Sequence, residues 1–406
     1  MSLTEPLNLR TGRVCWPEDD DAVPRGDPWP AGPVDVAIVG AGVMGAMLAE
    51  RLTAEGRRVA LIDRRPPARG ATAASTALVM WPADIPLVTL AQTWGEAEAA
   101  RRWRRVHSAV LDLAGRVAAL GLRADWMPRP ELYLAGDRLD EFGLRREAEA
   151  RAAAGLPSRY LTPSEVAATF GLPPRAALLS QDAFSVDPMA LTLELLAQAR
   201  RRGATLTWPA DVVSIAAIGD GVRLTTAGGA TLDAGQAVLA TGYEAARDYL
   251  PPAFKLGSSF AIATAPGVAP LWRDGAMIWE AADPYLYART TADGRIVVGG
   301  ADEDFADAAR RDALLPDKRR DLERRGAEML GCDVLESDCA WAATFGTSPD
   351  GLPAIGAVRG FEQLWLAAGF GGNGVTFASL AAGLIAAGLS GEPDPDAACF
   401  SPYRFG

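Results

Sequence analysis

The chain has 406 residues, 49% of them hydrophobic, which is enough for two domains that each bury a core. With 40 Lys and Arg against 51 Asp and Glu residues, the formal net charge of −11 leaves no broad basic surface for a nucleic acid. Four cysteines without Cys-x-x-Cys spacing argue against a disulfide framework, and a single histidine, His107, argues against triad or histidine–metal chemistry, so we expect no metal site.

Residues 1–32 form a polar, proline-rich segment with an acidic run from Glu18 to Asp21. We expect an extended arm over the surface rather than a packed element, and the acidic start is unlike a secretory signal. The apolar stretch from Phe377 to Leu389 is too short to span a bilayer. These features predict a cytoplasmic protein without a membrane span, and they leave the oligomeric state open.

The first strongly patterned region predicts a βαβ unit. The apolar run from Val34 to Val39 is expected to form a strand, and Gly40 to Gly45 form a glycine-rich turn. Apolar residues at helical spacing follow until Gly56, and Val59 to Ile62 predict the next strand.

The glycines of this turn fit a dinucleotide-binding site. Gly40 permits the tight turn, Gly42 lets the backbone approach a pyrophosphate, and Gly45 lets the helix pack on the strand. The phosphates would then meet the N-terminus of the helix. Asp63 lies 23 residues after Gly40, where a carboxylate can bind ribose hydroxyls.

The middle of the chain predicts two more helices and several strands. Apolar residues that step by three and four predict a long helix between Thr93 and Gly121. Asp187 as N-cap, Pro188 in the first turn and Gly203 beyond the end delimit the second helix. The expected strands are Thr205 to Trp208, Gly221 to Thr226 and Gln236 to Thr241.

Residues 257–300 are rich in strand-like runs separated by turn residues, which predicts an antiparallel sheet. Its expected strands are Phe260 to Thr264, Ala276 to Trp279, Tyr285 to Arg289 and Arg295 to Gly299. Alternation places Tyr285, Tyr287 and Arg289 on one face, where they line a substrate pocket together or form surface pairs. All three are candidate catalytic residues, with Arg289 as the candidate anchor for an anionic group.

The end of the chain returns to a strand, Leu364 to Ala368, a glycine cluster, Gly369 to Gly374, and a helix. NAD and FAD share the first glycine turn, so the choice between them depends on other segments. The small residues Gly70 to Ser75 can lie against a flat ring system, and the glycine cluster offers a second set of backbone N–H groups at a helix start. Together they favour FAD.

Several stretches, in this order, resemble the D-amino acid oxidase family of flavoproteins, which includes glycine oxidase and sarcosine oxidase. The stretches are VDVAIVGAGVMGAMLAERLTAEGRRVALIDRR, GATAASTAL, DPMALTLELLAQARRRGATL, AVLATGY, YLYARTTADGRIVVGG, and WAATFGTSPDGLPAIG followed by WLAAGFGGNGVTF. The resemblance implies an α/β fold with a Rossmann-like FAD-binding domain of the GR2 type and a second, antiparallel-sheet α+β substrate domain. The FAD-binding domain would comprise 33–115, 161–256 and 335–406, and the substrate domain 116–160 and 257–334.

The resemblance also implies the residues that contact FAD. Around the first turn and the segments that follow it, these are Gly40, Gly42, Val43, Met44, Gly45, Asp63, Arg64, Thr72, Ala74 and Ser75. Val212 would meet the adenine through its backbone, and Thr241 and Gly242 would lie near the dinucleotide. In the carboxy-terminal cluster, the implied residues are Gly369, Gly371, Gly372, Asn373, Gly374, Val375 and Thr376, the last four beside the flavin ring.

The chain departs from the family pattern at three positions. Phe345 stands where the amino-acid oxidases place an arginine for the substrate carboxylate, and a ring cannot replace a bidentate guanidinium. Ala343 stands where sarcosine oxidases carry the cysteine that tethers the flavin, which favours non-covalent FAD. Val297 stands near the place of their oxygen-activating lysine, so the electron acceptor stays open.

We therefore expect a flavoenzyme that oxidises the C–N bond of an amine or amino-acid-like small molecule by hydride transfer to FAD. Three alternatives remain at this point: a flavoprotein with a non-amine substrate, an FAD-binding protein without turnover, and an NAD-dependent dehydrogenase that uses the Gly40 to Gly45 turn.

Overall fold

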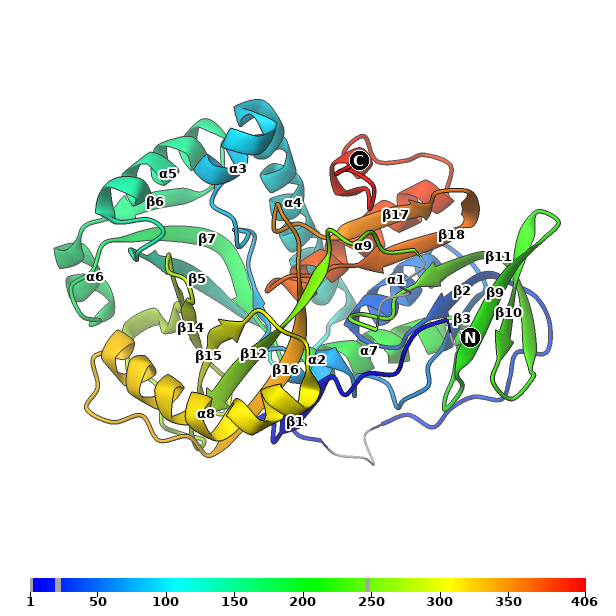
Figure 1. The fold of residues 1–406 in the computed structure, drawn as a ribbon, viewed down its shortest axis with the longest axis horizontal. Coiled ribbons are helices and arrows are strands. Elements are labelled where there is room, and N and C mark those ends of the chain that lie inside the picture. The colour runs from blue at the N-terminus through cyan, green and yellow to red at the C-terminus, as the bar shows by residue number, and fades with distance from the viewer. Residues whose placement is uncertain (1–2, 19–22, 245–248) are drawn as a thin grey trace.

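The computed structural model describes residues 3–18, 23–244 and 249–406, so most of the acidic run after Glu18 lies outside the described residues. These residues form two lobes, each built on one sheet (Figure 1). One lobe holds a mainly parallel sheet of eight described strands, and the other a mainly antiparallel sheet of ten.

The eight-stranded sheet grows from the predicted βαβ unit. β2 (Val34–Val39) and β3 (Val59–Ile62) pair in parallel and are joined by α1 (Val43–Ala54). The other strands are β8 (Thr205–Thr207), β9 (Val212–Ile218), β10 (Gly221–Thr226), β11 (Thr231–Leu239), β17 (Ala354–Val358) and β18 (Phe361–Ala368). Their order is β17-β18-β11-β2-β3-β8, and β9 and β10 extend from β11 as a hairpin.

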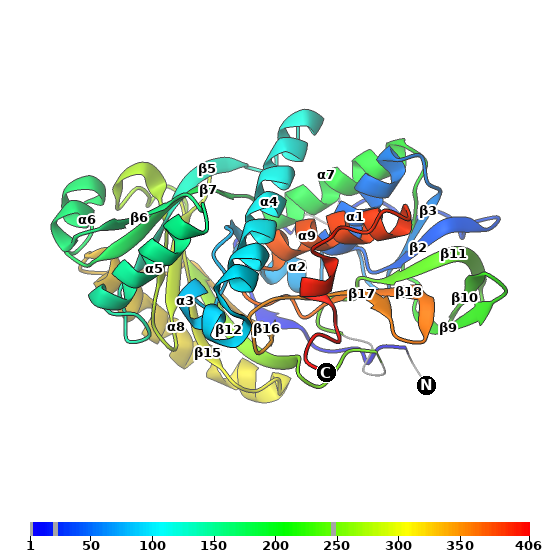
Figure 2. The same cartoon turned by 90° about the horizontal axis from the view of Figure 1, so that it is seen from above.

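Both faces of this sheet are buried. Val36 and Ile38 of β2 face one hydrophobic cluster with residues of the helices, and Ala37 and Val39 face another with residues of β9 and β10. Figure 2 shows α1 with α7 (Pro188–Arg201) and α9 (Gly374–Leu389) on one side of the sheet. This double coverage explains why the strands are continuous apolar runs in the sequence.

The ten-stranded sheet has the order β1-β16-β12-β15-β14-β13-β5-β7-β4, with β6 beside β7. All its described pairs are antiparallel except β13 with β5. The strands are β1 (Arg10–Gly12), β4 (Leu78–Val79), β5 (Met127–Leu134), β6 (Ser158–Leu161), β7 (Ala177–Ser185), β12 (Lys255–Ala263), β13 (Met277–Glu280), β14 (Leu286–Thr290), β15 (Ile296–Glu303) and β16 (Cys339–Thr347).

The remaining helices cover this second lobe or link the two. They are α2 (Ala71–Ala74), α3 (Leu87–Trp94), α4 (Glu96–Leu120), α5 (Glu141–Ala153), α6 (Pro163–Phe170) and α8 (Ala308–Leu330), with short 3-10 turns at Arg273–Gly275 and Ala397–Phe400. None of the described helices is long and apolar enough to cross a bilayer.

The structure corrects the expectation that the amino-terminal arm is not a packed element. Arg10–Gly12 form β1, which pairs antiparallel with β16, and Leu9, Val14 and Trp16 are buried. The expected domain boundaries also differ from the sheets, because β16 lies inside the proposed third FAD-binding segment and yet pairs within the ten-stranded sheet.

Candidate functional site

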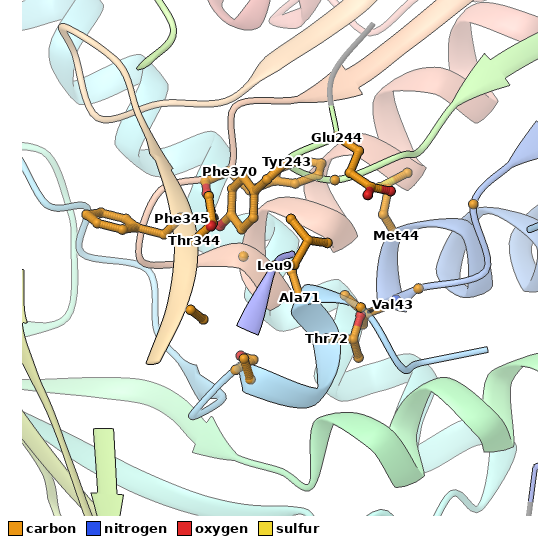
Figure 3. A pocket seen from close by; sticks show the side chains of 18 of the residues that line it. Leu9, Val43, Met44, Ala71, Thr72, Tyr243, Glu244, Thr344, Phe345 and Phe370 are labelled. Atoms are coloured by element: carbon orange, nitrogen blue, oxygen red, sulfur yellow. Dashed lines mark hydrogen bonds between the residues drawn. The ribbon is translucent and has the colours of Figure 1, made fainter. Parts of the chain in front are cut away.

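A cavity of about 1650 Å³, counting the space at its open mouth, has walls from both sheets. Val39 and Ile62 line it from the eight-stranded sheet, and Ser259, Tyr287 and Ala343 line it from the ten-stranded sheet. Gly40 and Gly42 of the first turn line it together with Gly371 to Gly374 of the carboxy-terminal cluster. Figure 3 shows side chains from separate segments, among them Leu9, Thr72 and Phe370, gathered around it.

The glycine turn has the geometry that its sequence predicts. Gly40 has a φ of +116°, and a Cβ there would lie 2.3 Å from the carbonyl oxygen of Ala240. A Cβ on Gly45 would lie 1.9 Å from the carbonyl oxygen of Gly40. A side chain at Gly40 would therefore push the turn away from the end of β11, and a side chain at Gly45 would push α1 away from the end of β2.

The N-terminus of α1 opens onto the cavity. Gly42 is the N-cap, and the backbone N–H of Val43 donates a hydrogen bond of 3.0 Å to Thr72 Oγ1. Gly42, Val43, Met44 and Thr72 all line the cavity. Free N–H groups and the helix dipole at such an end favour a phosphate.

Asp63 is fixed at the end of β3. Its Oδ2 accepts from the backbone N–H of Ala41 at 2.7 Å and its Oδ1 from that of Arg65 at 2.8 Å. Burial raises the pKa of Asp63, and the two N–H groups oppose the rise. Each carboxylate oxygen keeps a lone pair for a ribose hydroxyl. Next to it, Arg64 forms a 2.9 Å ion pair with Asp211.

Further residues implied by the resemblance lie on the same wall or behind it. Arg64, Ala74, Ser75, Val212, Thr241, Gly242, Asn373 and Val375 also line the cavity. Gly45, Gly369 and Thr376 do not: Thr376 Oγ1 donates to the carbonyl oxygen of Met80 at 2.9 Å and so fixes α9 from behind.

Of the three candidate catalytic residues of the antiparallel sheet, two line the cavity and one does not. Tyr285 and Tyr287 line the cavity, with ring centroids 6.0 Å apart. Arg289 does not: it is buried with its guanidinium 4.9 Å from the ring of Trp16, and its Nη1 donates to the carbonyl oxygen of Ala77. This corrects the expectation that Arg289 anchors an anion in the same pocket. Its pKa is lowered to about 10, chiefly by burial.

Several polar and aromatic residues on the cavity wall were not predicted as site residues from the sequence. They are Thr76, Asp84, Ser259, Trp279 and Asp302. Burial raises the pKa of Asp84, and it raises the pKa of Asp302 to about 7, with the charge of Asp84 adding to the latter rise. Burial likewise raises the pKa of Tyr287 to about 12, so its hydroxyl is protonated at neutral pH.

Phe345 and Ala343 line the cavity from β16, next to Thr344. The Phe345 ring packs against Gly257, where a Cβ would lie 2.9 Å from the ring, and in Figure 3 it extends away from Leu9 and Thr72. Among the described residues, neither a cysteine nor a histidine lines the cavity, and no group of three or more His, Cys, Asp or Glu residues could hold a metal ion.

Comparison with known proteins agrees with this geometry. A family model described as DAO, FAD dependent oxidoreductase, matches residues 35–388. Glycine oxidase from Geobacillus kaustophilus superposes with a TM-score of 0.73 at 23% identity, covering 92% of this chain and 99% of the oxidase. L-proline dehydrogenase from P. horikoshii superposes with a TM-score of 0.75 at 20% identity, covering 92% and 98%.

One relative aligns with most of this chain, but the alignment covers little more than half of the relative's own length. The tRNA 5-methylaminomethyl-2-thiouridine biosynthesis bifunctional protein MnmC of Thiobacillus denitrificans is 27% identical over 90% of this chain and 58% of its own length. The first curated relatives are matched over only 9% to 58% of their length.

The predicted fold class is confirmed, and so are FAD as the cofactor and an oxidoreductase activity. Because the family model covers most of the sequence and both glycine segments line one cavity, the chain belongs to the D-amino acid oxidase family of FAD-dependent oxidoreductases.

Proposed function

We propose that this enzyme oxidises the C–N bond of a small amine or amino-acid-like molecule. The observation that supports this most is a single cavity with two kinds of wall. The glycine segments and Asp63 offer a cradle for FAD, and the antiparallel sheet offers protonated tyrosines, buried carboxylates and aromatic rings for a second molecule. When bound, FAD would accept a hydride from the carbon next to the amine nitrogen.

The chain's own residues would orient the substrate and keep water away from it. Tyr285 and Tyr287 have raised pKa values because they are buried, so their hydroxyls donate hydrogen bonds at neutral pH. Trp279 packs edge-on against Tyr285, with ring centroids 6.4 Å apart, and excludes solvent beside it. Holding the reacting carbon in one geometry accounts for a large part of the rate enhancement in such transfers.

The proposed reaction is balanced as follows. The amine enters neutral, its α C–H bond breaks with transfer of the hydride, and the nitrogen lone pair forms the C=N bond of an iminium ion. Water adds to that bond, the C–N bond breaks, and a carbonyl compound leaves together with ammonium from a primary amine or with a protonated amine from a substituted one. An external acceptor, dioxygen or an oxidising dye, then takes up the two electrons.

The binding of FAD is proposed to be non-covalent. Ala343 stands at the position implied for a tethering cysteine, and none of the described cavity-lining residues is a cysteine or histidine. The FAD-contact residues named from the sequence are proposed contacts, with Gly45 and Thr376 acting from behind the wall.

The test is reduction of the FAD-loaded protein under nitrogen by a panel of amines and amino acids. We expect bleaching of the visible flavin absorption by at least one of them and a carbonyl product in matching amount. Bleaching by NADH alone, or by no compound of the panel, would contradict the proposal and favour one of the alternatives.

A second candidate substrate comes from the MnmC relative, whose name states a role in tRNA modification. The net charge of −11 disfavours tRNA, because binding of nucleic acid depends on basic residues that neutralise phosphates. Gel-shift titration of FAD-loaded protein with bulk tRNA at low salt distinguishes the two, since a salt-dependent shift would favour tRNA.

A further inference from the structure

One wall of the cavity combines two carboxylates with three aromatic side chains. Asp84, Trp279, Tyr285, Tyr287 and Asp302 all line it, and we call this set the acid–aromatic wall. Trp279 comes from β13, Tyr287 from β14 and Asp302 from β15. Three neighbouring strands therefore present these groups to one space.

The rings of this wall are held in place. Trp279 stacks on Tyr133 with centroids 4.0 Å apart, and Tyr285 lies between Trp279 and Tyr287 at 6.4 Å and 6.0 Å. Gly299 on β15 makes room for Tyr287, since a Cβ there would lie 2.2 Å from the tyrosine hydroxyl oxygen. Aromatic faces attract cations within about 6 Å of the ring centre.

The two carboxylates lack a counter-charge on this wall. Asp84 Oδ2 accepts from the backbone N–H of Gly372 at 3.1 Å. The Asp302 carboxylate has a hydrogen bond with the Ser259 side chain, but its Oδ1 is buried and has no hydrogen-bond partner within the described chain. A buried carboxylate oxygen that lacks a partner is costly, and a cation that enters the cavity would offset that cost.

The cations nearby are engaged elsewhere. Lys318 lowers the pKa of Asp302, and Arg138 lowers that of Asp84, by their charge alone. Lys318 forms an ion pair with Glu303 at 2.7 Å and Arg138 forms one with Asp283 at 2.7 Å. Neither Lys318 nor Arg138 lines the cavity.

The guanidinium groups that do line the described cavity come from the segment after β3. Each of the three has a carboxylate partner: Arg64 with Asp211 at 2.9 Å, Arg65 with Glu244 at 2.7 Å, and Arg69 with Glu18 at 3.1 Å.

We propose that the acid–aromatic wall binds an ammonium group of the substrate, so that the preferred substrates are amines with a second positive charge and without an α-carboxylate, such as diamines and polyamines. This inference rests on the proposed amine oxidation and names its substrate class. An α-carboxylate in this space would meet two carboxylates and no arginine, since Phe345 stands at the position implied for that arginine. The second ammonium group stays protonated throughout, and the reacting nitrogen enters neutral.

The test compares putrescine with pentylamine, which has the same chain length but one charge, and with glycine and sarcosine. Rapid mixing of each with FAD-loaded protein under nitrogen separates the immediate perturbation of the flavin spectrum, which reports binding, from bleaching, which reports oxidation. We expect putrescine to bind at least about tenfold more tightly than pentylamine, a difference of about 1.4 kcal/mol. Glycine or sarcosine binding as tightly as putrescine would overturn the inference.

Variants test the carboxylates directly. Asp302→Asn and Asp84→Asn should each lower the affinity for putrescine about tenfold and change that for pentylamine little. The matched control is Asp304→Asn, since Asp304 is exposed and does not line the cavity. An unchanged preference for putrescine in both cavity variants would overturn the inference.

The wild-type protein provides an independent readout if a variant loses its flavin. Putrescine and pentylamine must each lose one proton for the reacting nitrogen to enter neutral, so the ratio of their affinities removes that common pH dependence. Ionisation of Asp302 should raise this ratio in favour of putrescine as the pH rises through about 7, because only putrescine keeps an ammonium group. A ratio that does not change across this pH range would contradict the role of Asp302. Carboxylate-dependent binding without bleaching would refute the proposed oxidation and leave the binding inference standing.

Discussion

Asp302 should make the folded protein less stable at alkaline pH. Its pKa is raised from 3.8 to about 7 because folding buries the carboxylate. An acid with a raised folded pKa binds its proton more tightly in the folded state, so stability is lost as the pH rises from about 4 through about 7. Each pKa unit corresponds to about 1.4 kcal/mol, which sets an upper limit of about 4 kcal/mol.

Although the Oδ1 atom of Asp302 is buried, the residue as a whole is only half-buried and stays partly solvated, so we expect about half of this limit, roughly 2 kcal/mol, from the neutral variant Asp302→Asn at pH 8. Unfolding entropies of about 2 cal/mol/K per residue convert this to a rise in Tm of about 2 °C for a chain of 406 residues.

The measurement is differential scanning calorimetry of FAD-loaded wild type and variant at pH 5 and pH 8. The gain in Tm should be present at pH 8 and small at pH 5, and Asp304→Asn should show neither. Equal shifts in Tm at both pH values, or a less stable variant at pH 8, would refute the conclusion that Asp302 is a desolvated, ionised carboxylate. A residue that lowers the stability of the fold in this way is typical of a residue that serves binding.

Four further outcomes are expected. Gly40→Ala should weaken FAD binding by at least about tenfold, because a left-handed φ costs about 1–2 kcal/mol and the new Cβ meets a carbonyl oxygen. Fluorescence titration of the apoprotein with FAD checks this, and the control is Gly56→Ala, where a Cβ would have no atom within 4 Å. Glu244→Gln should destabilise the protein by about 2 kcal/mol, since this buried carboxylate pairs with an arginine and holds the arm; an unchanged Tm would contradict this. Arg289→Met should leave KM for any oxidised amine within about twofold, because the arginine is off the cavity; steady-state kinetics decide. Acid precipitation should release all of the flavin, given Ala343, and flavin retained by the pellet would contradict non-covalent binding.

Elements with strong local signals were predictable from the sequence. The Asp187 cap and Pro188 fix the start of α7, and Gly121 ends α4 in the left-handed conformation. The glycine turn between β2 and α1 was equally clear, because only glycine tolerates those close backbone contacts.

Other features depend on contacts between distant segments. β1 is three residues long and pairs with β16 more than 300 residues later, so no local pattern marks it. Helix α8 is strongly polar and contains Pro316, which obscures its helical period. Asp84 and Asp302 become neighbours only through tertiary folding, and neither belongs to a motif.

Arg289 shows where a correct pattern gives a wrong site. Alternation placed it on the same face as Tyr287, as expected. Two residues along a strand cover about 6.6 Å, however, and this step carries Arg289 beyond the cavity to Trp16. Alternation along a strand therefore predicts on which side of the sheet a side chain lies, but it does not predict whether that side chain reaches the cavity.

We propose that the amino-terminal turn and the carboxy-terminal glycine cluster hold one FAD molecule between them. The decisive experiment is a crystal structure of the FAD-loaded protein. We expect one FAD per chain, with its pyrophosphate at the backbone of Gly42 and Val43 and its ring system beside Gly371 to Val375. Density that places the ring system away from the carboxy-terminal cluster, or a dinucleotide outside this cavity, would contradict it.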